Sequence, residues 1–132
     1  MSLIPVHIKL FSLIIVSKSK DVLKLIYKSE REITLTAEYL RVFSPSAEVR
    51  GHRSSDYTLQ VGKKNVVILD VKTVGLYAIQ IVFDDGHDSG IYSWDYLVSL
   101  RENYDKNWNS YLRHLKNKNK SRLPDIQILE IK

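Results

Sequence analysis

Alternation of apolar and polar residues divides the first half of the chain into short strands and one helix. Residues 22–27 alternate and are rich in β-branched and aromatic side chains, which predicts a strand. Residues 32–35 have the same character and follow a polar turn, so we expect an antiparallel hairpin. Thr36 is a suitable N-cap for a short helix over residues 37–42, and Pro45 should prevent that helix from continuing.

The second half of the chain carries another set of strands. Residues 66–71 and 75–83 are strand candidates, residues 84–86 should form a turn, and residues 90–92 return as a short strand. Residues 50–57 contain Gly, His, Arg, Ser and Asp, which predicts an exposed loop between the two halves.

Two further helices are expected near the end. The first starts at Ser93 or Asp95 and runs to about residue 102. The second is indicated by residues at helical spacing, namely Trp108, Tyr111, Leu112 and Leu115. Residues 123–132 alternate again and form either an edge strand or a loose tail. This order predicts an α+β fold: one domain over residues 1–132, with an antiparallel sheet and two or three helices on one side.

Composition fits a globular domain. The 132 residues suffice to bury a core, and 44% of them are hydrophobic, which argues against a disordered chain. There is no cysteine, so disulfides, thiolate zinc sites, cysteine-ligated iron–sulfur clusters and cysteine nucleophiles are excluded. Residues 10–16 are apolar, but a membrane helix needs about 20 residues, and the start lacks signal-peptide features. We expect a cytoplasmic protein with no membrane contact.

The net charge of +5 is concentrated late in the chain. Residues 113–122 contain no acid and include Arg113, His114, Lys116, Lys118, Lys120 and Arg122. A solvated helix end and tail is the favoured interpretation. A nucleic-acid contact is the alternative, which we rank below it because no nucleic-acid-binding motif accompanies the charge.

Polar residues gather in the predicted turn after residue 83. Asp84, Asp85 and Asp88 stand beside His87, a combination that can perform acid–base chemistry when burial shifts the pKa values. Asp and Gly are also the residues that turns select, so an ordinary turn is favoured from the sequence alone.

Basic residues could serve this turn in two ways. Arg41, Arg50, Lys63 and Lys64 could pair with Glu48 and Asp84, or they could hold an anionic ligand. An internal salt-bridge network is the favoured interpretation.

The nearby aromatic residues Tyr77, Tyr92, Trp94 and Tyr96 could stack on a base or a trimethylammonium group. In strand and helix-start positions they are more often core residues, and we expect Tyr77 and Trp94 to be mostly buried.

Two segments carry a family resemblance. Residues 40–52 read LRVFSPSAEVRGH and residues 83–97 begin FDDGHDSGIYSW. Together they resemble the signatures of the gamma-butyrobetaine hydroxylase-like N-terminal domain family, also called DUF971. Short proteobacterial members share the serine-containing form of the first segment. Residues 11–17 look like an insertion, and Lys28-Ser29-Glu30 replaces the Asp-Gly turn of the family.

The resemblance implies the loss of a zinc site. In eukaryotic dioxygenases with this domain, the first segment supplies three cysteines and the second a histidine. Those cysteine positions are here Ser44, Ser46 and Val49, so only His87 is left. We predict folding without zinc and expect no cofactor. His52 and His87 with acidic neighbours are the alternative set for iron or zinc, ranked below a simple hydrogen-bonded role for His87.

The resemblance also implies that residues 44–52 pack beside residues 84–90, with Arg41 or Arg50 contacting a carboxylate of the turn. It does not transfer catalysis, because the catalytic iron residues of those dioxygenases lie in a separate domain and the chain has no His-x-Asp/Glu iron motif.

We expect a stand-alone, non-catalytic adaptor or assembly domain. Related domains accompany dioxygenases or Mrp-like ATPases that carry iron–sulfur clusters, which implies a cytoplasmic protein partner. The sequence leaves the oligomeric state undecided, and a homodimer is one alternative. The expected interaction face comprises Arg41, Ser44, Ser46, Glu48, Arg50, His52, Asp84, Asp85, His87 and Asp88. The alternatives are a metal-binding protein using His52 and His87, or a small enzyme using residues 84–88.

Overall fold

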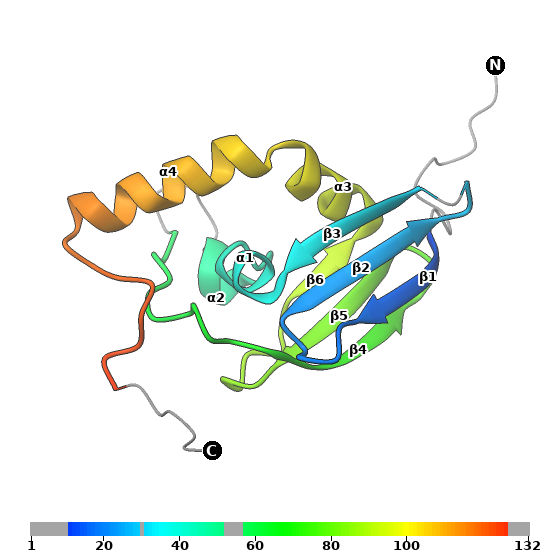
Figure 1. Ribbon diagram of the computed structural model, residues 1–132, viewed down its shortest axis with the longest axis horizontal. Coiled ribbons are helices and arrows are strands. Elements are labelled where there is room, and N and C mark those ends of the chain that lie inside the picture. The colour runs from blue at the N-terminus through cyan, green and yellow to red at the C-terminus, as the bar shows by residue number, and fades with distance from the viewer. Residues whose placement is uncertain (1–10, 30, 52–56, 127–132) are drawn as a thin grey trace.

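Two antiparallel sheets, each of three strands, form the framework of the computed structural model, which describes residues 11–29, 31–51 and 57–126. The first sheet has the order β1–β2–β3, with β1 at Phe11–Val16, β2 at Val22–Tyr27 and β3 at Glu32–Thr36. The second has the order β4–β5–β6, with β4 at Ile68–Val74, β5 at Ala78–Phe83 and β6 at Ile91–Ser93. Figure 1 shows the strands on one side of the molecule.

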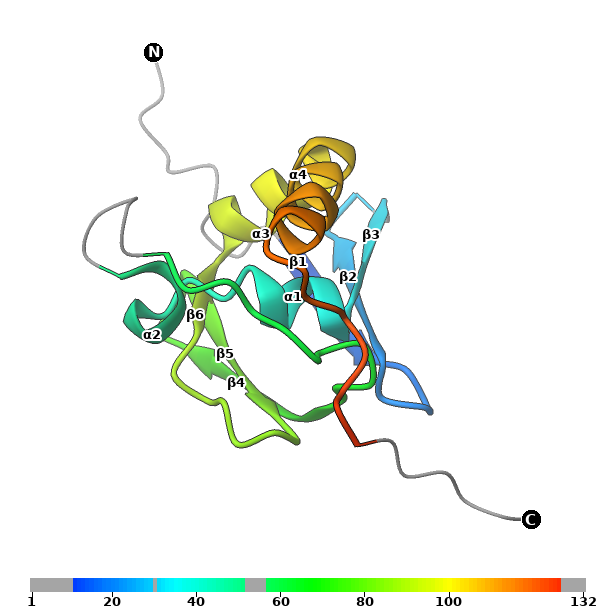
Figure 2. The same cartoon turned by 90° about the vertical axis from the view of Figure 1, so that its left-hand side faces the viewer.

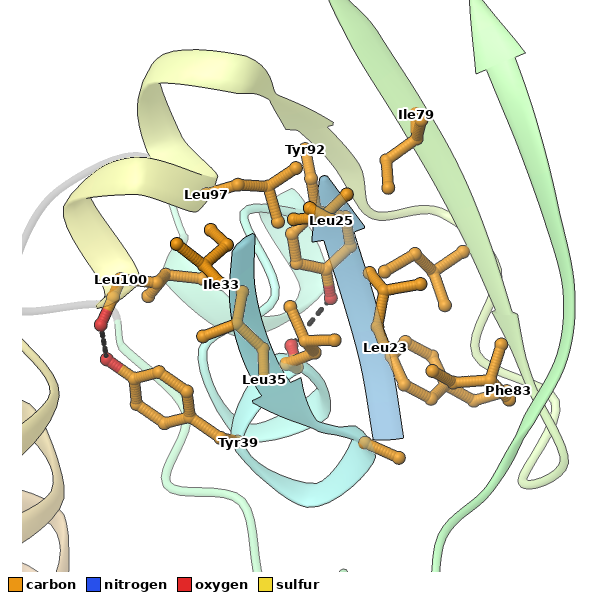
Figure 3. Close-up of a cluster of buried hydrophobic side chains, with 14 of the residues drawn as sticks. Leu23, Leu25, Ile33, Leu35, Tyr39, Ile79, Phe83, Tyr92, Leu97 and Leu100 are labelled. Atoms are coloured by element: carbon orange, nitrogen blue, oxygen red, sulfur yellow. Dashed lines mark hydrogen bonds between the residues drawn. The ribbon is translucent and has the colours of Figure 1, made fainter. Parts of the chain in front are cut away.

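The α+β class is confirmed, but the expectation of a single sheet is wrong. Buried side chains of both sheets belong to one cluster, which includes Leu23, Leu25, Ile33, Leu35, Ile68, Ile79, Ile81, Phe83 and Tyr92. Figure 3 shows side chains of β2 and β3 pointing toward those of β5 and β6. Alternation predicts which side chains of a strand face the core. It does not reveal whether two hairpins join edge to edge or pack against each other.

The described residues form four helices, which lie beside and above the strands (Figures 1 and 2). They are α1 at Ala37–Val42, α2 at Ala47–Arg50, α3 at Trp94–Glu102 and α4 at Tyr104–Asn117. The expected N-cap Thr36 is confirmed, and of the two predicted starts of α3 the structure selects Ser93 as the N-cap: Thr36 Oγ1 and Ser93 Oγ each accept a backbone N–H at 3.1 Å. The single-turn helix α2 was not predicted, because it has too few residues to display a period.

Strand β1 lies in the segment that looked like an insertion. It pairs with β2 along its length, with an irregularity between Phe11 and Leu13. Ile14 and Val16 pack against the core. The segment is therefore an edge strand of the first sheet.

The β4–β5 connection corrects two expectations. β4 begins at Ile68, two residues later than predicted, and β5 begins at Ala78, later than predicted because Gly75 turns the chain at a φ of +56°. Tyr77, expected in the core, is 46% exposed because it lies in this turn. Trp94 is buried as expected, and its indole N–H donates to the Leu76 carbonyl at 2.7 Å.

The segment after α4 is held by contacts with the loop before β4 and with α1 and α4. Gly62 N–H donates to the Ser121 carbonyl and Lys64 N–H to the Arg122 carbonyl, each at 3.0 Å. Arg122 donates to both carboxylate oxygens of Glu38, at 2.7 and 2.6 Å, and lies over the Trp108 ring. One residue of the basic stretch therefore has an internal role. Residues 127–132, which belong to the predicted edge strand or tail, lie outside the described residues.

Across residues 11–29, 31–51 and 57–126, no helix combines the length and apolar character needed to span a membrane.

Candidate functional site

The segment that links α1 to α2 lies against the turn that links β5 to β6. The His87 imidazole joins them: its Nε2 is 2.8 Å from Ser44 Oγ and 3.3 Å from Ser46 Oγ. Ser89 Oγ adds a hydrogen bond to Glu48 Oε1 at 2.9 Å. The predicted packing of these two segments is confirmed for their described residues.

Gly90 permits this close approach. A Cβ at position 90 would lie 2.5 Å from Ser44 Oγ, closer than real Cβ contacts, and 3.0 Å from Tyr92 Cε1, which is tighter than most of them. The serine therefore sits where only a glycine leaves room for it.

His87 is buried, and burial lowers its pKa below the ordinary value of 6.5. The charge of Arg41 lowers that pKa further, against the opposing effect of Glu48, whose Oε2 is 3.6 Å from Nδ1. The imidazole is thus neutral at neutral pH. A proton on Nδ1 would face Glu48 and leave Nε2 to accept from the Ser44 hydroxyl, which satisfies both contacts.

A second connection is ionic. Arg41 Nε donates to Asp85 Oδ2 at 2.8 Å, and Lys63 Nζ reaches the same oxygen at 2.7 Å. Arg41 is 7% exposed and also donates to Gln60 Oε1 at 2.9 Å. Burial raises the pKa of Asp85, but hydrogen bonds from Lys63 and the His87 backbone, together with Arg41, outweigh it and hold that pKa below its ordinary value. The expected contact between Arg41 and a turn carboxylate is confirmed.

Two residues of the predicted face have other contacts. The Arg50 guanidinium lies 5.7 Å from the centre of the Tyr96 ring. Asp84 Oδ1 accepts from the Val67 N–H at 3.0 Å and so fixes the start of the second sheet. His52 lies outside the described residues.

Tyrosine hydroxyls also fasten this region. Tyr92 donates to the Leu40 carbonyl and Tyr96 to the Phe43 carbonyl, each at 2.6 Å. Burial raises the pKa of Tyr96 to about 12 and that of Tyr92 still further, so both hydroxyls stay protonated as donors. From the sequence, stacking on a ligand was one interpretation of these two rings. Their use as donors to α1 and the residue that follows it depends on contacts between distant residues, which the sequence did not reveal.

The side chains of Ser44, His87 and Glu48 follow one another in the order of a nucleophile, a base and an orienting carboxylate. Ser44, however, is fully buried, and Ser46 is 5% exposed. The arrangement therefore joins the two segments through buried hydroxyl groups.

The same side chains do not fit a zinc ion. Tetrahedral structural sites use nitrogen and thiolate ligands. Here Val49 has no donor atom, and the two serine hydroxyls are neutral and already hydrogen-bonded to His87. Among the described residues, no three His, Asp or Glu side chains group as a metal site would require.

Comparison with known proteins supports the resemblance seen in the sequence. Residues 14–98 match the family model described as gamma-butyrobetaine hydroxylase-like, N-terminal. No curated protein matches the chain.

Solved structures are similar over most of the chain. One NMR solution structure has 42% identity and a TM-score of 0.74, and covers 94% of this chain and 98% of its own. Another has 37% identity and a TM-score of 0.76, and covers 100% of this chain and 98% of its own. A crystal structure of a DUF971 protein of unknown function from Acidithiobacillus ferrooxidans has 31% identity and a TM-score of 0.58, and covers 70% of this chain and 93% of its own.

Proposed function

Because this chain belongs to the gamma-butyrobetaine hydroxylase-like N-terminal domain family, also called DUF971, we propose that it is a non-catalytic adaptor domain that binds a cytoplasmic protein. The observation that carries the proposal is the use of its signature side chains in internal contacts. Ser44, His87 and Arg41 are all buried and hydrogen-bonded to one another or to the turn. They hold the two segments together, and their own polar groups are used in these contacts.

The buried contacts present a rigid, mixed-charge surface. The Glu48 side chain is 70% exposed, and Arg50, Asp84 and Asp88 are also exposed around the joined segments. We call these four residues the signature face. A surface of both signs whose backbone is fixed from beneath suits recognition of a complementary protein, because little ordering is required on binding.

The proposal is tested by photo-crosslinking in native cytosol. Benzoylphenylalanine in place of Asp88 should capture a discrete protein, whereas the same group in place of the exposed Asp105 on α4 should not. The double charge reversal Glu48→Lys, Asp88→Lys should abolish binding of the captured protein after its purification. The matched control Glu102→Lys, Asp105→Lys makes the same charge change on α3 and α4 and should leave binding intact.

Other outcomes would support the alternatives. If both double variants bind the captured protein equally well, the signature face is not the surface that binds it. Turnover of gamma-butyrobetaine with 2-oxoglutarate and iron that disappears in His87→Ala, with the circular dichroism spectrum retained, would favour an enzyme. Stoichiometric iron or zinc that is lost in a His52→Ala, His87→Ala double variant would favour a metal-binding protein.

A further inference from the structure

A long cleft runs between the edges of the two sheets. Two adjoining hollows of about 550 and about 560 Å³ share Ile14 of β1 and Thr73 of β4. The first extends from Ile14 past Lys18, and the second extends to Phe11 and Trp94. Both hollows are lined on one side by β1 and on the other by β4, so the cleft follows the length of a strand.

Both walls of the cleft are strand edges, and they are open beyond Ile68, whose N–H donates to the Lys20 carbonyl at 2.8 Å. In the described residues β1 pairs only with β2, and β4 only with β5. Ser17 N–H donates to the Val22 carbonyl, so alternation along an antiparallel ladder turns the backbone groups of Val16 and Ile14 away from β2. Such edge groups can form hydrogen bonds with an added extended chain.

Apolar side chains surround these open edges. Ile14, Val16 and Val71 line the cleft and pack against the core. Leu13, Leu69 and Leu76 also line it and are 51%, 54% and 48% exposed. Exposed leucines gathered along one groove typically mark a binding surface. They would accept alternate side chains of an extended chain.

The lysines at the ends of the cleft indicate which kind of segment would bind there. The exposed Lys18 and Lys20 lie at one end of the cleft and Lys28 at the other. Neither Lys18 nor Lys20 has a carboxylate partner within the described part of the chain. Asp70, the acid among the lining residues, is approached by Lys72 at 4.0 Å. Lysines therefore outnumber acids along the lining, with Lys18 and Lys20 against Asp70 in the first hollow and Lys28 in the second.

We propose that this cleft binds an extended segment of a partner protein, with alternating apolar residues in the middle and acidic residues at its ends. The segment adds as a strand to the open edges, its apolar side chains meet Leu13, Leu69 and Leu76, and its acidic ends meet the lysines. This second surface involves none of the signature face, so the two proposals stand or fall separately.

The test starts from a random library of displayed peptides of about eight residues, the length of one strand with its flanks. Selection on the full chain should enrich alternating apolar sequences with acidic ends. An enriched peptide, titrated into isotope-labelled protein, should shift the amide signals of β1 and β4 in a saturable way. The same peptide with alternate backbone amides methylated should lose binding, because it cannot pair with an edge.

Matched charge reversals locate the site. Lys18→Glu, Lys20→Glu should weaken binding about tenfold, as expected for two exposed ion pairs. Lys118→Glu, Lys120→Glu makes the same change after α4, at two exposed lysines, and should leave the affinity unchanged.

Several results would overturn the proposal. These are a selection that enriches nothing, equal binding by peptides with lysine ends, and amide shifts confined to α4 or the signature face. Concentration-dependent shifts of β1 and β4 without peptide would identify a second copy as the occupant. Strong exchange protection of the Ile14 and Val16 amides in the free protein would mean that another part of this chain fills the cleft.

Discussion

Arg41 and Asp85 are 44 residues apart in the chain, and their side chains meet at 2.8 Å with the guanidinium almost fully buried. Removing one partner of a buried ion pair leaves the other uncompensated, at a cost of about 3 kcal/mol. Asp85 would keep Lys63, while Gln60 Oε1 would lose the donor Arg41. We therefore expect Arg41→Ala to lower the free energy of unfolding by about 2–3 kcal/mol.

Arg50 provides an intermediate case, since its guanidinium lies over an aromatic ring, a contact worth about 0.5–1 kcal/mol. Lys118 is exposed and should contribute nothing measurable. Urea denaturation of the three alanine variants should rank Arg41 first, Arg50 second and Lys118 last. An Arg41→Ala variant as stable as Lys118→Ala would contradict this view of the site.

His87 should make stability depend on pH in mildly acidic solution. Burial and Arg41 hold its folded-state pKa below the ordinary 6.5, so the unfolded chain binds the proton first as pH falls. Stability is therefore lost as pH drops below about 6.5 toward the folded-state pKa. The groups that face His87 are Arg41, Glu48, Asp85 and Lys63.

The pH dependence can be assigned by substitution. Asp85 has a lowered pKa, so its contribution is lost only as pH falls below about 3.8, well outside the window of His87. Thermal melts of His87→Asn between about pH 5 and 7 should show a flatter dependence than the wild type. Equal slopes for the two proteins would show that His87 does not carry the effect.

Gly90→Ala should destabilise the protein by about 1–3 kcal/mol, since an added methyl group would overlap Ser44 Oγ. The double variant Gly90→Ala, Ser44→Ala removes the overlapping oxygen. Its loss of stability should be smaller than the sum of the two single losses, measured by chemical denaturation. Additive losses would mean that Ser44 moves aside without cost.

Zinc should not contribute to stability. A structural zinc supplies about 10 kcal/mol or more in small domains, and this chain must replace that contribution by packing. Thermal melts with and without a strong chelator should superimpose. A drop of several degrees on adding chelator would refute the prediction.

The converse prediction is that the site can regain zinc. Ser44 and Ser46 already point at His87 Nε2, so the triple variant Ser44→Cys, Ser46→Cys, Val49→Cys should bind zinc stoichiometrically. The same triple variant with His87→Ala should bind it less tightly. Metal analysis after dialysis measures both.

Local chemistry made several features predictable. Thr36 was identified as a cap, and Ser93 as one of two possible helix starts, because side-chain oxygens at such positions satisfy the first backbone N–H groups of a helix. The approach of Ser44 to His87 was expected because the family resemblance places both in one site. Neither inference needed knowledge of distant packing.

Features that depend on distant contacts were not predictable. The split into two sheets is set by packing between hairpins, and the exposure of Tyr77 by the place of the Gly75 turn. The partners of Tyr92 and Tyr96 are more than 50 residues away, at Leu40 and Phe43. No periodicity in the sequence reports such pairs.

The pair of Glu38 and Arg122 has a consequence for synthesis on the ribosome. Its members are separated by 84 positions, and the carboxylate lies nearly buried on α1. Residues matched by the family model end at 98, so both sheets and most of α3 have been synthesised while Glu38 still lacks its cation. A nascent chain halted before residue 122 would therefore carry an unpaired acid against its own core.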